Sequence, residues 1–318
     1  MPEPPLSVSV VVPVYNSEPT LAELVGRLEA TFGPDLREVI LVDDGSRDQS
    51  WQRITELARN DVLIRGVRLM RNFGQHNATL TGARLATGDV TVTIDDDLQC
   101  PPEEAPRLVA ELRRGHDVVY GVPLNSQHDL SRRLGSWLIK RALQLAMGVP
   151  GAVSASSYRA FLTQLRRGFE HYDGPFVSID VLLSWTTSRF SSLPVEHRAR
   201  AAGRSQYTLR KLVNHAVTMV TGFTAWPLRI ASALGFLLTV LGALLLVFVL
   251  GRYALSGGQT VPGFSFLASV VVTFAGAELF ALGIIGEYLA RIHFRSMQRP
   301  QAVVRESVDG RVREEVTA

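Results

Sequence analysis

Residues 90–99 read VTVTIDDDLQ, a short β-branched run that leads into three consecutive aspartates. Four more short apolar runs, at 8–12, 39–42, 63–69 and 118–120, are bounded by turn residues and predict strands. Helical stretches are predicted between them, at Thr20–Thr31, Asp48–Arg59, Gln75–Ala86 and Glu103–Arg114. Strands and helices that alternate at this spacing are typical of a mostly parallel sheet covered on both faces. We therefore expect an α/β domain.

The composition excludes several classes of protein. The 318 residues include 33 Lys and Arg against 30 Asp and Glu, a net charge of +3, and 46% are hydrophobic. A chain with this much apolar surface and so little net charge is not disordered in bulk. Cys100 is the only cysteine, which excludes a disulfide framework. The mean hydropathy of +0.13 is high for a chain that is 20% charged, and it directs attention to membrane segments.

The apolar excess lies toward the C-terminus. Ile230–Gly251 holds 22 residues without a charge. A helix of that length spans about 33 Å, against about 30 Å for the hydrocarbon core of a bilayer. A second apolar run, Phe264–Ile285, contains one charged residue, Glu278. We predict two transmembrane helices; the alternative is a helical hairpin buried in a soluble domain.

Basic residues indicate the orientation of these two helices. Arginines and lysines flank both apolar runs, whereas the connecting loop holds only Arg252. The positive-inside rule then places both flanks, and with them both termini, in the cytoplasm. Residues 206–228 carry apolar side chains at helical spacing, with Arg210 and Lys211 off that stripe. This pattern predicts an amphipathic helix on the inner leaflet, or else an ordinary helix packed on the globular domain.

Two acidic clusters follow predicted strands. Asp43-Asp44-Gly45-Ser46 comes after 39–42, and Asp95-Asp96-Asp97 comes after 90–94. Ligands of parallel sheets bind beyond the carboxyl ends of the strands, and grouped carboxylates repel unless a cation or donors compensate. In extended backbone Asp95 and Asp97 point the same way, and Gln99 continues that face. Carboxylate and amide oxygens suit Mg²⁺ or Mn²⁺ rather than Zn²⁺, and such an ion would neutralise a bound diphosphate.

These motifs occur in an order that resembles family-2 glycosyltransferases, in particular the bacterial polyprenyl-phosphate glycosyltransferases similar to dolichol-phosphate mannose synthase. The resemblance covers nearly the whole chain. It is carried by Val12-Pro13-Val14-Tyr15-Asn16, Val42-Asp43-Asp44-Gly45-Ser46, Asn72-Phe73-Gly74, Gly88-Asp89, Asp95-Asp96-Asp97-Leu98-Gln99, Pro101-Pro102-Glu103, Arg200-Ala201-Ala202-Gly203-Arg204-Ser205-Gln206-Tyr207 and Gly286-Glu287-Tyr288-Leu289.

The resemblance implies a GT-A fold and assigns roles to particular residues. The nucleotide base and ribose would be held by Pro13, Tyr15, Glu18 and Asp44. The metal and diphosphate group would be Asp95, Asp97 and Gln99. The region that closes over the diphosphate and the lipid phosphate would contain Arg200, Ser205 and Tyr207, with Lys211 as a weaker candidate.

The sequence departs from the family on the acceptor side. Relatives carry an acidic residue, proposed as a base, where this chain has Ser156-Ser157-Tyr158-Arg159. Gly121-Val122-Pro123 replaces a usual basic residue, and Cys100 stands where Asp or His is common. Asp180 is the best remaining acid for the acceptor side, although a plain charge at a helix N-terminus explains it equally well.

The resemblance implies an inverting enzyme that moves one sugar from a nucleotide-sugar, UDP-linked by family frequency, to undecaprenyl phosphate. Asp97, Asp180 and Arg200 are the predicted catalytic residues. Because the second pKa of a phosphate monoester is near 6, the nucleophile is largely ionised at neutral pH and a strong base is less necessary. Alternatives are a processive polysaccharide synthase, against which the lack of a Gln-x-x-Arg-Trp motif argues, and a non-catalytic membrane protein that binds nucleotide-sugar or acts as a scaffold.

The expected organisation has four parts. They are a GT-A domain at 1–205, the amphipathic helix at 206–228, a transmembrane hairpin at 229–290 and a cytoplasmic tail at 291–318. The expected location is the inner membrane, with the catalytic domain in the cytoplasm. By family resemblance the chain forms a homo-oligomer, a tetramer, in contact with membrane lipid and without nucleic acid.

Overall fold

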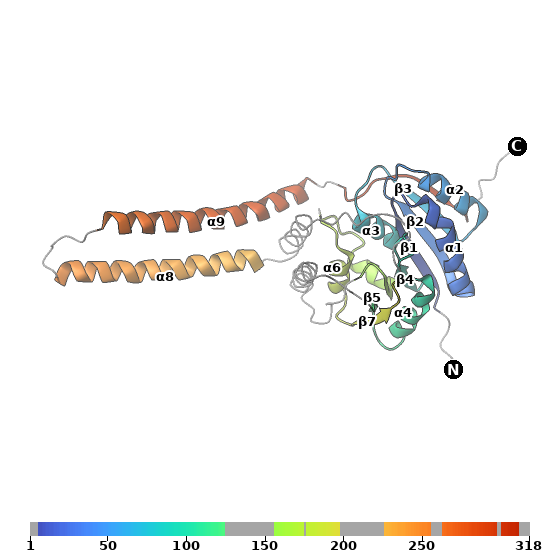
Figure 1. Cartoon of the computed structure of the whole chain (residues 1–318), viewed down its shortest axis with the longest axis horizontal. Helices are drawn as coiled ribbons and strands as arrows, with labels where there is room; N and C mark the ends of the chain where they lie inside the picture. The colour runs from blue at the N-terminus through green and yellow to red at the C-terminus, as the bar shows by residue number, and fades with distance from the viewer. Residues whose placement is uncertain are drawn as a thin grey trace. The chain divides into compact units, whose positions relative to one another are not determined.

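The computed structural model describes residues 6–124, 156–174, 176–197, 226–255, 263–297 and 300–311. The chain divides into two compact units. Met1–Ala216 and Gln298–Ala318 form the first unit, and Val217–Met297 form the second. The first unit contains the sheet, and the segment at the C-terminal end of the chain returns to it (Figure 1).

The first unit is built on one eight-stranded sheet. Its strands are β1 (Val8–Val14), β2 (Leu36–Asp43), β3 (Ile64–Leu69), β4 (Val90–Thr93), β5 (Val118–Pro123), β6 (Arg159–Leu162), β7 (Phe190–Val195) and β8 (Val304–Asp309). Its helices are α1 (Glu18–Phe32), α2 (Ser50–Asn60), α3 (Gln75–Leu85), α4 (Ala105–Leu112) and α6 (Ile179–Ser184), with 3₁₀ turns at Gly33–Asp35, Pro102–Glu104 and Thr163–Gly168. The described strands follow the order β7-β5-β6-β4-β1-β2-β3-β8.

Most of this sheet is parallel, as the alternation of strands and helices predicted. The strands β4, β1, β2 and β3 pair in parallel, whereas β6 and β8 run antiparallel to their neighbours. The five strands and the four helices that the sequence predicted are all present, with ends shifted by a few residues. The strands β6, β7 and β8 were not predicted, because they are short or rich in polar residues and lack a clear period of two.

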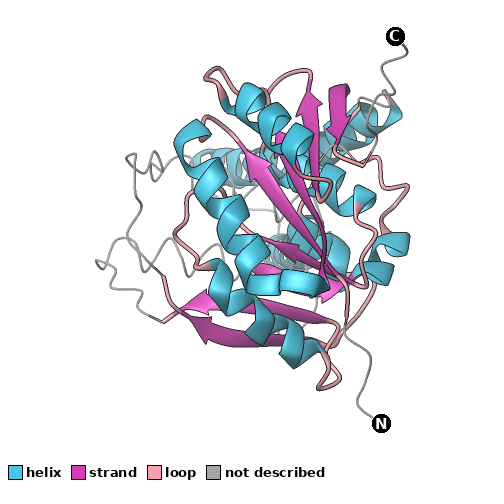
Figure 2. Cartoon of the chain, turned by 90° about the vertical axis from the view of Figure 1, so that its right-hand side faces the viewer, coloured by secondary structure: helices cyan, strands magenta, loops and turns pink. Residues whose placement is uncertain are grey.

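Helices cover both faces of the sheet, because successive strand residues point to opposite sides. On β1, Val10 and Val12 belong to the core cluster that packs against α1, α2 and α4. Val11 belongs to the opposite cluster, with Ala78 of α3. Figure 2 shows the twisted sheet with helices lying along it. A sheet buried on both sides exposes mainly its strand ends, so the ends are where the chain can build a site.

The last described segment of the chain forms β8, which pairs with the edge strand β3. Gly66 of β3 pairs with Val308 of β8. A Cβ on Gly66 would lie 2.5 Å from Ile54 Cγ2 and 3.2 Å from Val308 Cγ1, so glycine permits the side chains of Ile54 and Val308 to approach the strand closely. The segment predicted as a tail at 291–318 therefore contains a strand that the sequence analysis did not predict. The four predicted domain boundaries stay predictions.

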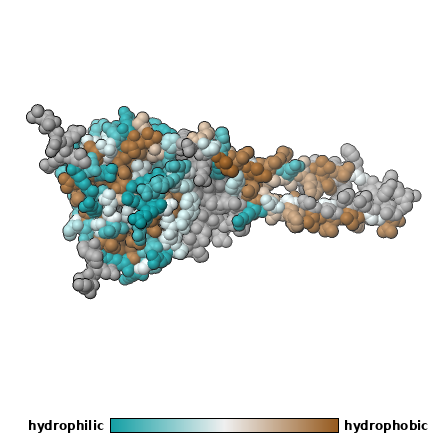
Figure 3. All heavy atoms as spheres, turned by 180° about the vertical axis from the view of Figure 1, so that it is seen from behind, coloured by the Kyte–Doolittle hydropathy of each residue, from teal (hydrophilic) through white to brown (hydrophobic). Residues whose placement is uncertain are grey.

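The second unit contains two long helices, α8 (Trp226–Leu255) and α9 (Phe264–Ser296). They lie side by side, with Gly242 of α8 next to the ring of Phe274 of α9. Figure 3 shows apolar side chains along both helices. Phe236 and Phe280 are among the large apolar side chains that are exposed. Within the part of the chain that the structure describes, no helix combines the length and hydropathy needed to cross a bilayer. The two transmembrane helices thus remain a prediction.

Candidate active site

A pocket opens where three parallel strands end. The strand β1 lies between β2 and β4, so the carboxyl ends of these three strands meet at one edge of the sheet. The pocket there has a volume of about 340 Å³. It is lined by Pro13, Val14, Tyr15, Asp44, Asn72, Gly74, Gln75, Asp95, Asp96 and Asp97. The structure thus brings together five residues for which the sequence suggested ligand contacts: Pro13, Tyr15, Asp44, Asp95 and Asp97.

A second hollow, of about 390 Å³, lies around Thr87, Asp89 and Arg166. Its polar groups form hydrogen bonds within the protein and so stabilise the fold. Asp89 accepts hydrogen bonds from the backbone N–H and the hydroxyl of Ser7, and Arg166 donates to the backbone oxygens of Arg84 and Ala86 at the end of α3. This hollow is at the amino ends of the strands, whereas ligands of parallel sheets bind at the carboxyl ends. We therefore place the functional site at the other pocket.

The two aspartates at the end of β2, Asp43 and Asp44, have different contacts. Asp43 is buried, accepts a hydrogen bond from Ser46 N at 2.9 Å and faces Arg68 Nε at 3.2 Å, so it stabilises its own turn. Asp44 accepts from Phe73 N at 2.7 Å and from Gly74 N at 2.8 Å. Burial raises the pKa of Asp44, against the effect of these two donors. Asp44 thereby fixes the loop that forms one wall of the pocket.

The three aspartates after β4 point in different directions. Asp95 accepts from Gln75 Nε2 at Oδ1 and from Ser157 Oγ at Oδ2, each at 2.6 Å. Asp96 turns back to the first strand, where its Oδ2 accepts from Tyr15 N at 3.0 Å. Asp97 Oδ1 accepts from Gln99 N at 3.1 Å. Asp96 therefore joins the turns after β1 and β4, while Asp95 and Asp97 flank it in the pocket.

The middle aspartate has an unusual electrostatic environment. Burial raises the pKa of Asp96 to about 6, and the charges of Asp95 and Asp97 add to this, against the stabilising hydrogen bonds from Ser17 and Tyr15. Three acids within one turn thus repel one another, which is costly unless a cation is added. The turn is a site of concentrated negative charge.

The side chains at this turn fit a divalent cation that a substrate would help to bind. Within the described ranges, no group of three or more His, Cys, Asp or Glu side chains forms a ready-made metal cage. The carboxylates of Asp95 and Asp97 and the amide of Gln99 supply oxygen donors only. Mg²⁺ typically binds through one or two carboxylates plus substrate phosphates. This open set therefore fits Mg²⁺ or Mn²⁺ bound together with a diphosphate.

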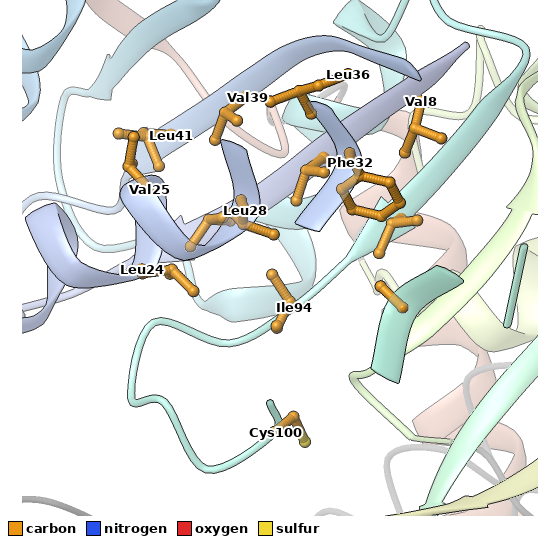
Figure 4. Packing of buried hydrophobic residues seen from close by; sticks show 14 of the residues in the cluster. Val8, Leu24, Val25, Leu28, Phe32, Leu36, Val39, Leu41, Ile94 and Cys100 are labelled. Atoms are coloured by element: carbon orange, nitrogen blue, oxygen red, sulfur yellow. The ribbon is translucent and has the colours of Figure 1, made fainter. Parts of the chain in front are cut away.

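Cys100 is not a ligand in this arrangement. Its side chain is buried and packs in the cluster that also holds Leu24 and Leu28 of α1 and Ile94 (Figure 4). Burial, with the charges of Asp95 and Asp97, raises the pKa of the thiol to about 12. A neutral thiol is a poor ligand and a poor nucleophile. The residue directly after Gln99 thus packs as a small apolar side chain.

Asp180 lies in the first turn of α6, inside a closed cluster. Its Oδ1 accepts from Arg159 Nη1 at 2.5 Å and from the hydroxyl of Tyr120 at 3.0 Å. The Arg159 and Asp180 side chains are only 4% and 8% exposed. Burial, with the neighbouring Asp180 charge, raises the pKa of Tyr120 well above its usual range. This geometry favours a role for Asp180 in positioning β5, β6 and α6. Asp180 does not line the pocket.

Other predicted residues lie elsewhere. Glu18 is exposed at the start of α1 and Gln99 is half-buried beside the acidic turn, but neither lines the pocket. Tyr15 is 42% exposed and lines the pocket, where an aromatic side chain suits stacking on a base. The remaining candidates, Arg200, Ser205, Tyr207 and Lys211, are outside the residues that the structure describes.

Gln75 and the buried partner of Asp180 were not among the residues predicted for the site. Gln75 begins α3 directly after Gly74, whose φ of 96° turns the chain into the helix. A helix that starts after β3 must begin at the same sheet edge as the acidic turns, so the topology was the signal that could have found Gln75. No local signal pairs Arg159 with Asp180, since β6 itself was not predicted.

Comparison with known proteins extends these findings. Residues 9–174 match the Glycosyl transferase family 2 domain. The undecaprenyl-phosphate 4-deoxy-4-formamido-L-arabinose transferase of Enterobacter sp. (strain 638) is 37% identical over 306 residues, which cover 95% of this chain and 93% of that protein. The protein of the same name from Klebsiella pneumoniae is 36% identical over 311 residues, with 96% and 95% covered.

Among solved structures, the fold resembles glucosyl-3-phosphoglycerate synthase from Mycobacterium tuberculosis. Its complex with Mn²⁺ and UDP-glucose matches with a TM-score of 0.51 and 20% identity, over 68% of this chain and 77% of that one. The complex of the same protein with Mn²⁺, UDP and glucosyl-3-phosphoglycerate matches with a TM-score of 0.50 and 19% identity, over 68% and 78%. At this identity the likeness concerns the fold, which is that of the GT-A domains.

Proposed function

The chain belongs to glycosyl transferase family 2 and is a glycosyltransferase with a GT-A domain, and from this premise we propose that it moves one sugar from a nucleotide-sugar to undecaprenyl phosphate. The observation that carries the proposal is the pocket at the ends of β1, β2 and β4, where two acidic turns meet. Relatives that span the same length and bear the name of undecaprenyl-phosphate sugar transferases support the acceptor.

The donor occupies this pocket in our proposal. The turn at Pro13 and Tyr15, with Asp44, holds the base and ribose, and Glu18 contributes from the start of α1. Asp95, Asp97 and Gln99 hold a divalent ion against the diphosphate. A bound Mg²⁺ or Mn²⁺ supplies charge neutralisation to the departing nucleoside diphosphate. The solved complexes of the mycobacterial synthase with Mn²⁺ and UDP support a divalent ion and a uridine nucleotide.

The transfer itself is an inverting displacement. A phosphate oxygen of the acceptor attacks the anomeric carbon, the bond from that carbon to the diphosphate oxygen breaks, and the nucleoside diphosphate leaves with the electron pair. Because the acceptor is already ionised at neutral pH, the site works with Ser157 where relatives carry an acid. Asp180 acts by positioning, since its carboxylate is held by Arg159 and Tyr120.

The region beyond the described part of the first unit completes the site in this proposal. Arg200 clamps phosphate oxygens with its planar guanidinium, and Ser205 and Tyr207 contribute donors. Residues 206–228 lie on the inner leaflet, and 229–290 cross the inner membrane twice, with the catalytic domain and both termini in the cytoplasm. The uncharged stretch at 230–251 and the basic residues on either side support this placement. The chain assembles as a homo-oligomer, a tetramer by analogy with the family.

One experiment tests the proposed reaction. The purified full-length protein is incubated with Mg²⁺ or Mn²⁺, undecaprenyl phosphate and a panel of UDP-sugars that includes UDP-4-deoxy-4-formamido-L-arabinose and UDP-glucose. We expect one donor to give a glycolipid of the corresponding mass, and none after chelation of the metal. Metal-dependent binding of UDP-sugars without any transfer or release of UDP would contradict the proposal and favour the non-catalytic alternative.

A further inference from the structure

We propose that Ser157 and Gln75 are positioning residues that clamp the Asp95 carboxylate from both sides and so orient it toward a divalent cation and diphosphate. The proposal rests on the proposed function, because it concerns how that site is kept ready for its ligand. It adds two residues to the site that the sequence motifs do not include.

The clamp has three parts from three elements. Asp95 follows β4, Gln75 is the first residue of α3, and Ser157 precedes β6. Gln75 Nε2 donates to Asp95 Oδ1 and Ser157 Oγ donates to Asp95 Oδ2, both at 2.6 Å. One donor on each oxygen removes the freedom of the carboxylate to rotate about its Cβ–Cγ bond. Each carboxylate oxygen can accept more than one hydrogen bond or ligand, so one donor on each oxygen is compatible with coordination of a cation.

Ser157 is itself held in place. The hydroxyl of Thr93, at the end of β4, donates to Ser157 O at 2.5 Å. The hydroxyl of Tyr158 donates to Pro101 O at 3.0 Å, beyond the acidic turn. The segment at 156–158 is therefore attached to the strand before the acidic turn and to the loop after it. The Ser157 hydroxyl cannot move far from Asp95 without breaking these contacts, which is what a positioning residue requires.

The charge of the two donors also matters. A carboxylate at position 157 would face Asp95 at hydrogen-bond distance and add a fourth acid to the cluster of Asp95, Asp96 and Asp97, which increases the repulsion within the turn. The Ser157 hydroxyl and the Gln75 amide are neutral and donate to Asp95. The pair thus holds the Asp95 carboxylate in one orientation without adding charge to the acidic turn.

The clamp also connects the two ends of the donor pocket. Asp44 accepts from Gly74 N, and Gln75, the next residue, donates to Asp95. The wall that we assign to the nucleotide and the carboxylate that we assign to the metal are thus joined through the first turn of α3. Binding of a nucleotide against this wall therefore stabilises the metal-binding orientation of Asp95, and we expect UDP and Mn²⁺ to bind cooperatively.

The test compares Ser157→Ala with Ser156→Ala in the full-length protein. Ser156 is the matched control, since it is the neighbouring serine and its hydroxyl accepts from Tyr158 N at 3.2 Å, without contact to Asp95. Affinity for Mn²⁺ is measured by electron paramagnetic resonance, with and without UDP. Groups that orient metal ligands are typically worth about 10- to 100-fold in metal affinity. We expect Ser157→Ala to weaken Mn²⁺ binding about 10-fold and Ser156→Ala to leave it unchanged.

Two further variants separate positioning from stability. Ser157→Thr keeps the hydroxyl and should bind Mn²⁺ like the wild type, and Gln75→Ala should weaken binding as Ser157→Ala does. The Mn²⁺ concentration for half-maximal transfer should rise with the dissociation constant, while kcat at saturating Mn²⁺ changes much less. Wild-type Mn²⁺ affinity in both alanine variants, with or without a lower melting temperature, would overturn the clamp. If the wild type binds no Mn²⁺ even with UDP, the proposed function fails and the clamp fails with it.

Discussion

The two halves of the sheet use their carboxylates in opposite ways. In the half formed by β1 to β4, acidic side chains at the strand ends line an open pocket. In the half formed by β5 to β7, they are closed into ion pairs, Asp180 with Arg159 and Asp117 with Arg189. The same residue type at the same sheet therefore serves a ligand on one side and the fold on the other. The difference lies in position, because Asp44, Asp95 and Asp97 line the pocket, whereas arginines hold Asp180 and Asp117 outside it.

This contrast has a physical cause in the strand directions. In the parallel half, consecutive strand ends point to one edge, so the acids that follow them gather there, and Arg68 pairs with the buried Asp43. The antiparallel β6 brings Arg159 to the same edge, between β4 and β5, and supplies the missing positive charge beside Asp180. Arg159 thus neutralises Asp180, and the acids that we assign to a metal are those that line the pocket at the ends of β1, β2 and β4.

Removing one pocket carboxylate should have the largest effect. We expect Asp97→Asn to lower turnover at least about 1000-fold, because several kcal/mol of charge stabilisation at the departing diphosphate are lost. Glycolipid formation, measured by mass spectrometry, checks this. The melting temperature should stay close to that of the wild type, since the hydrogen bond that Asp97 accepts from Gln99 N lies within its own turn. If Asp97→Asn retained its turnover, the metal assignment and the contrast between the two halves of the sheet would both be wrong.

Breaking the closed pair in the other half should instead cost stability. We expect Arg159→Met to lower the free energy of unfolding by about 3 kcal/mol, because Asp180 is left buried without its cation. Denaturant unfolding followed by circular dichroism measures this. The double variant Arg159→Met with Asp180→Leu should recover much of the loss, since no lone charge remains. A single variant as stable as the wild type would show that this half does not depend on the pair.

The parallel half could be predicted from sequence because its signals are local. The β-branched run at 90–94 and the apolar runs at 8–12 and 39–42 gave strands that the structure contains, and the acids that follow them were expected at one edge. Asp44 and Asp95 do lie together at that edge. Neither prediction required knowledge of a distant partner, since the direction of parallel strands fixes the edge by itself.

The rest depended on pairings across long stretches of sequence. Strand β6 has four residues, and its partners β4 and β5 are 70 and 41 positions away in the pairs Thr91–Phe161 and Val119–Ala160, differences that follow from the residue numbers. Strand β8, VRESVD, alternates too weakly to be recognised and pairs with β3 more than 200 residues earlier. The partners of Asp180 and Asp95 come from these long-range contacts, so the motifs alone did not indicate them.

A smaller effect is expected at the seam between the halves. Gln301, before β8, donates from Nε2 to Gly174 O at 2.8 Å, and Arg84 of α3 donates to Tyr172 O at 2.6 Å in the same loop. We expect Gln301→Ala to lower the free energy of unfolding by about 1 kcal/mol, the value of one such bond. Amide exchange at 169–174 should become faster. The exposed Gln164 offers the control, since Gln164→Ala should leave that loop unchanged.

The smallest effect concerns acids of the parallel half that lie away from its strand ends. Glu29, in the last turn of α1, contacts Asp61 after α2. Burial, with the hydrogen bond and charge of Asp61, raises the pKa of Glu29 from 4.5 to about 7. Between these values the folded chain binds more protons than the unfolded chain, so the free energy of unfolding falls as pH rises from 4.5 to 7.

We expect Glu29→Gln to remove this dependence. At pH 8 the variant should be more stable than the wild type, by less than about 1 kcal/mol because solvent screens a group that is partly exposed; at pH 4 the two should be equal. Denaturant unfolding at pH 4, 6 and 8 measures the difference, with Glu56→Gln as the control, since Glu56 faces Arg53. Glycolipid formation should not change, because Glu29 lies at the opposite end of α1 from the pocket. A loss of activity in Glu29→Gln would contradict this expectation. It would mean that acids of the β1 to β4 half affect ligand binding even when they lie away from the strand ends.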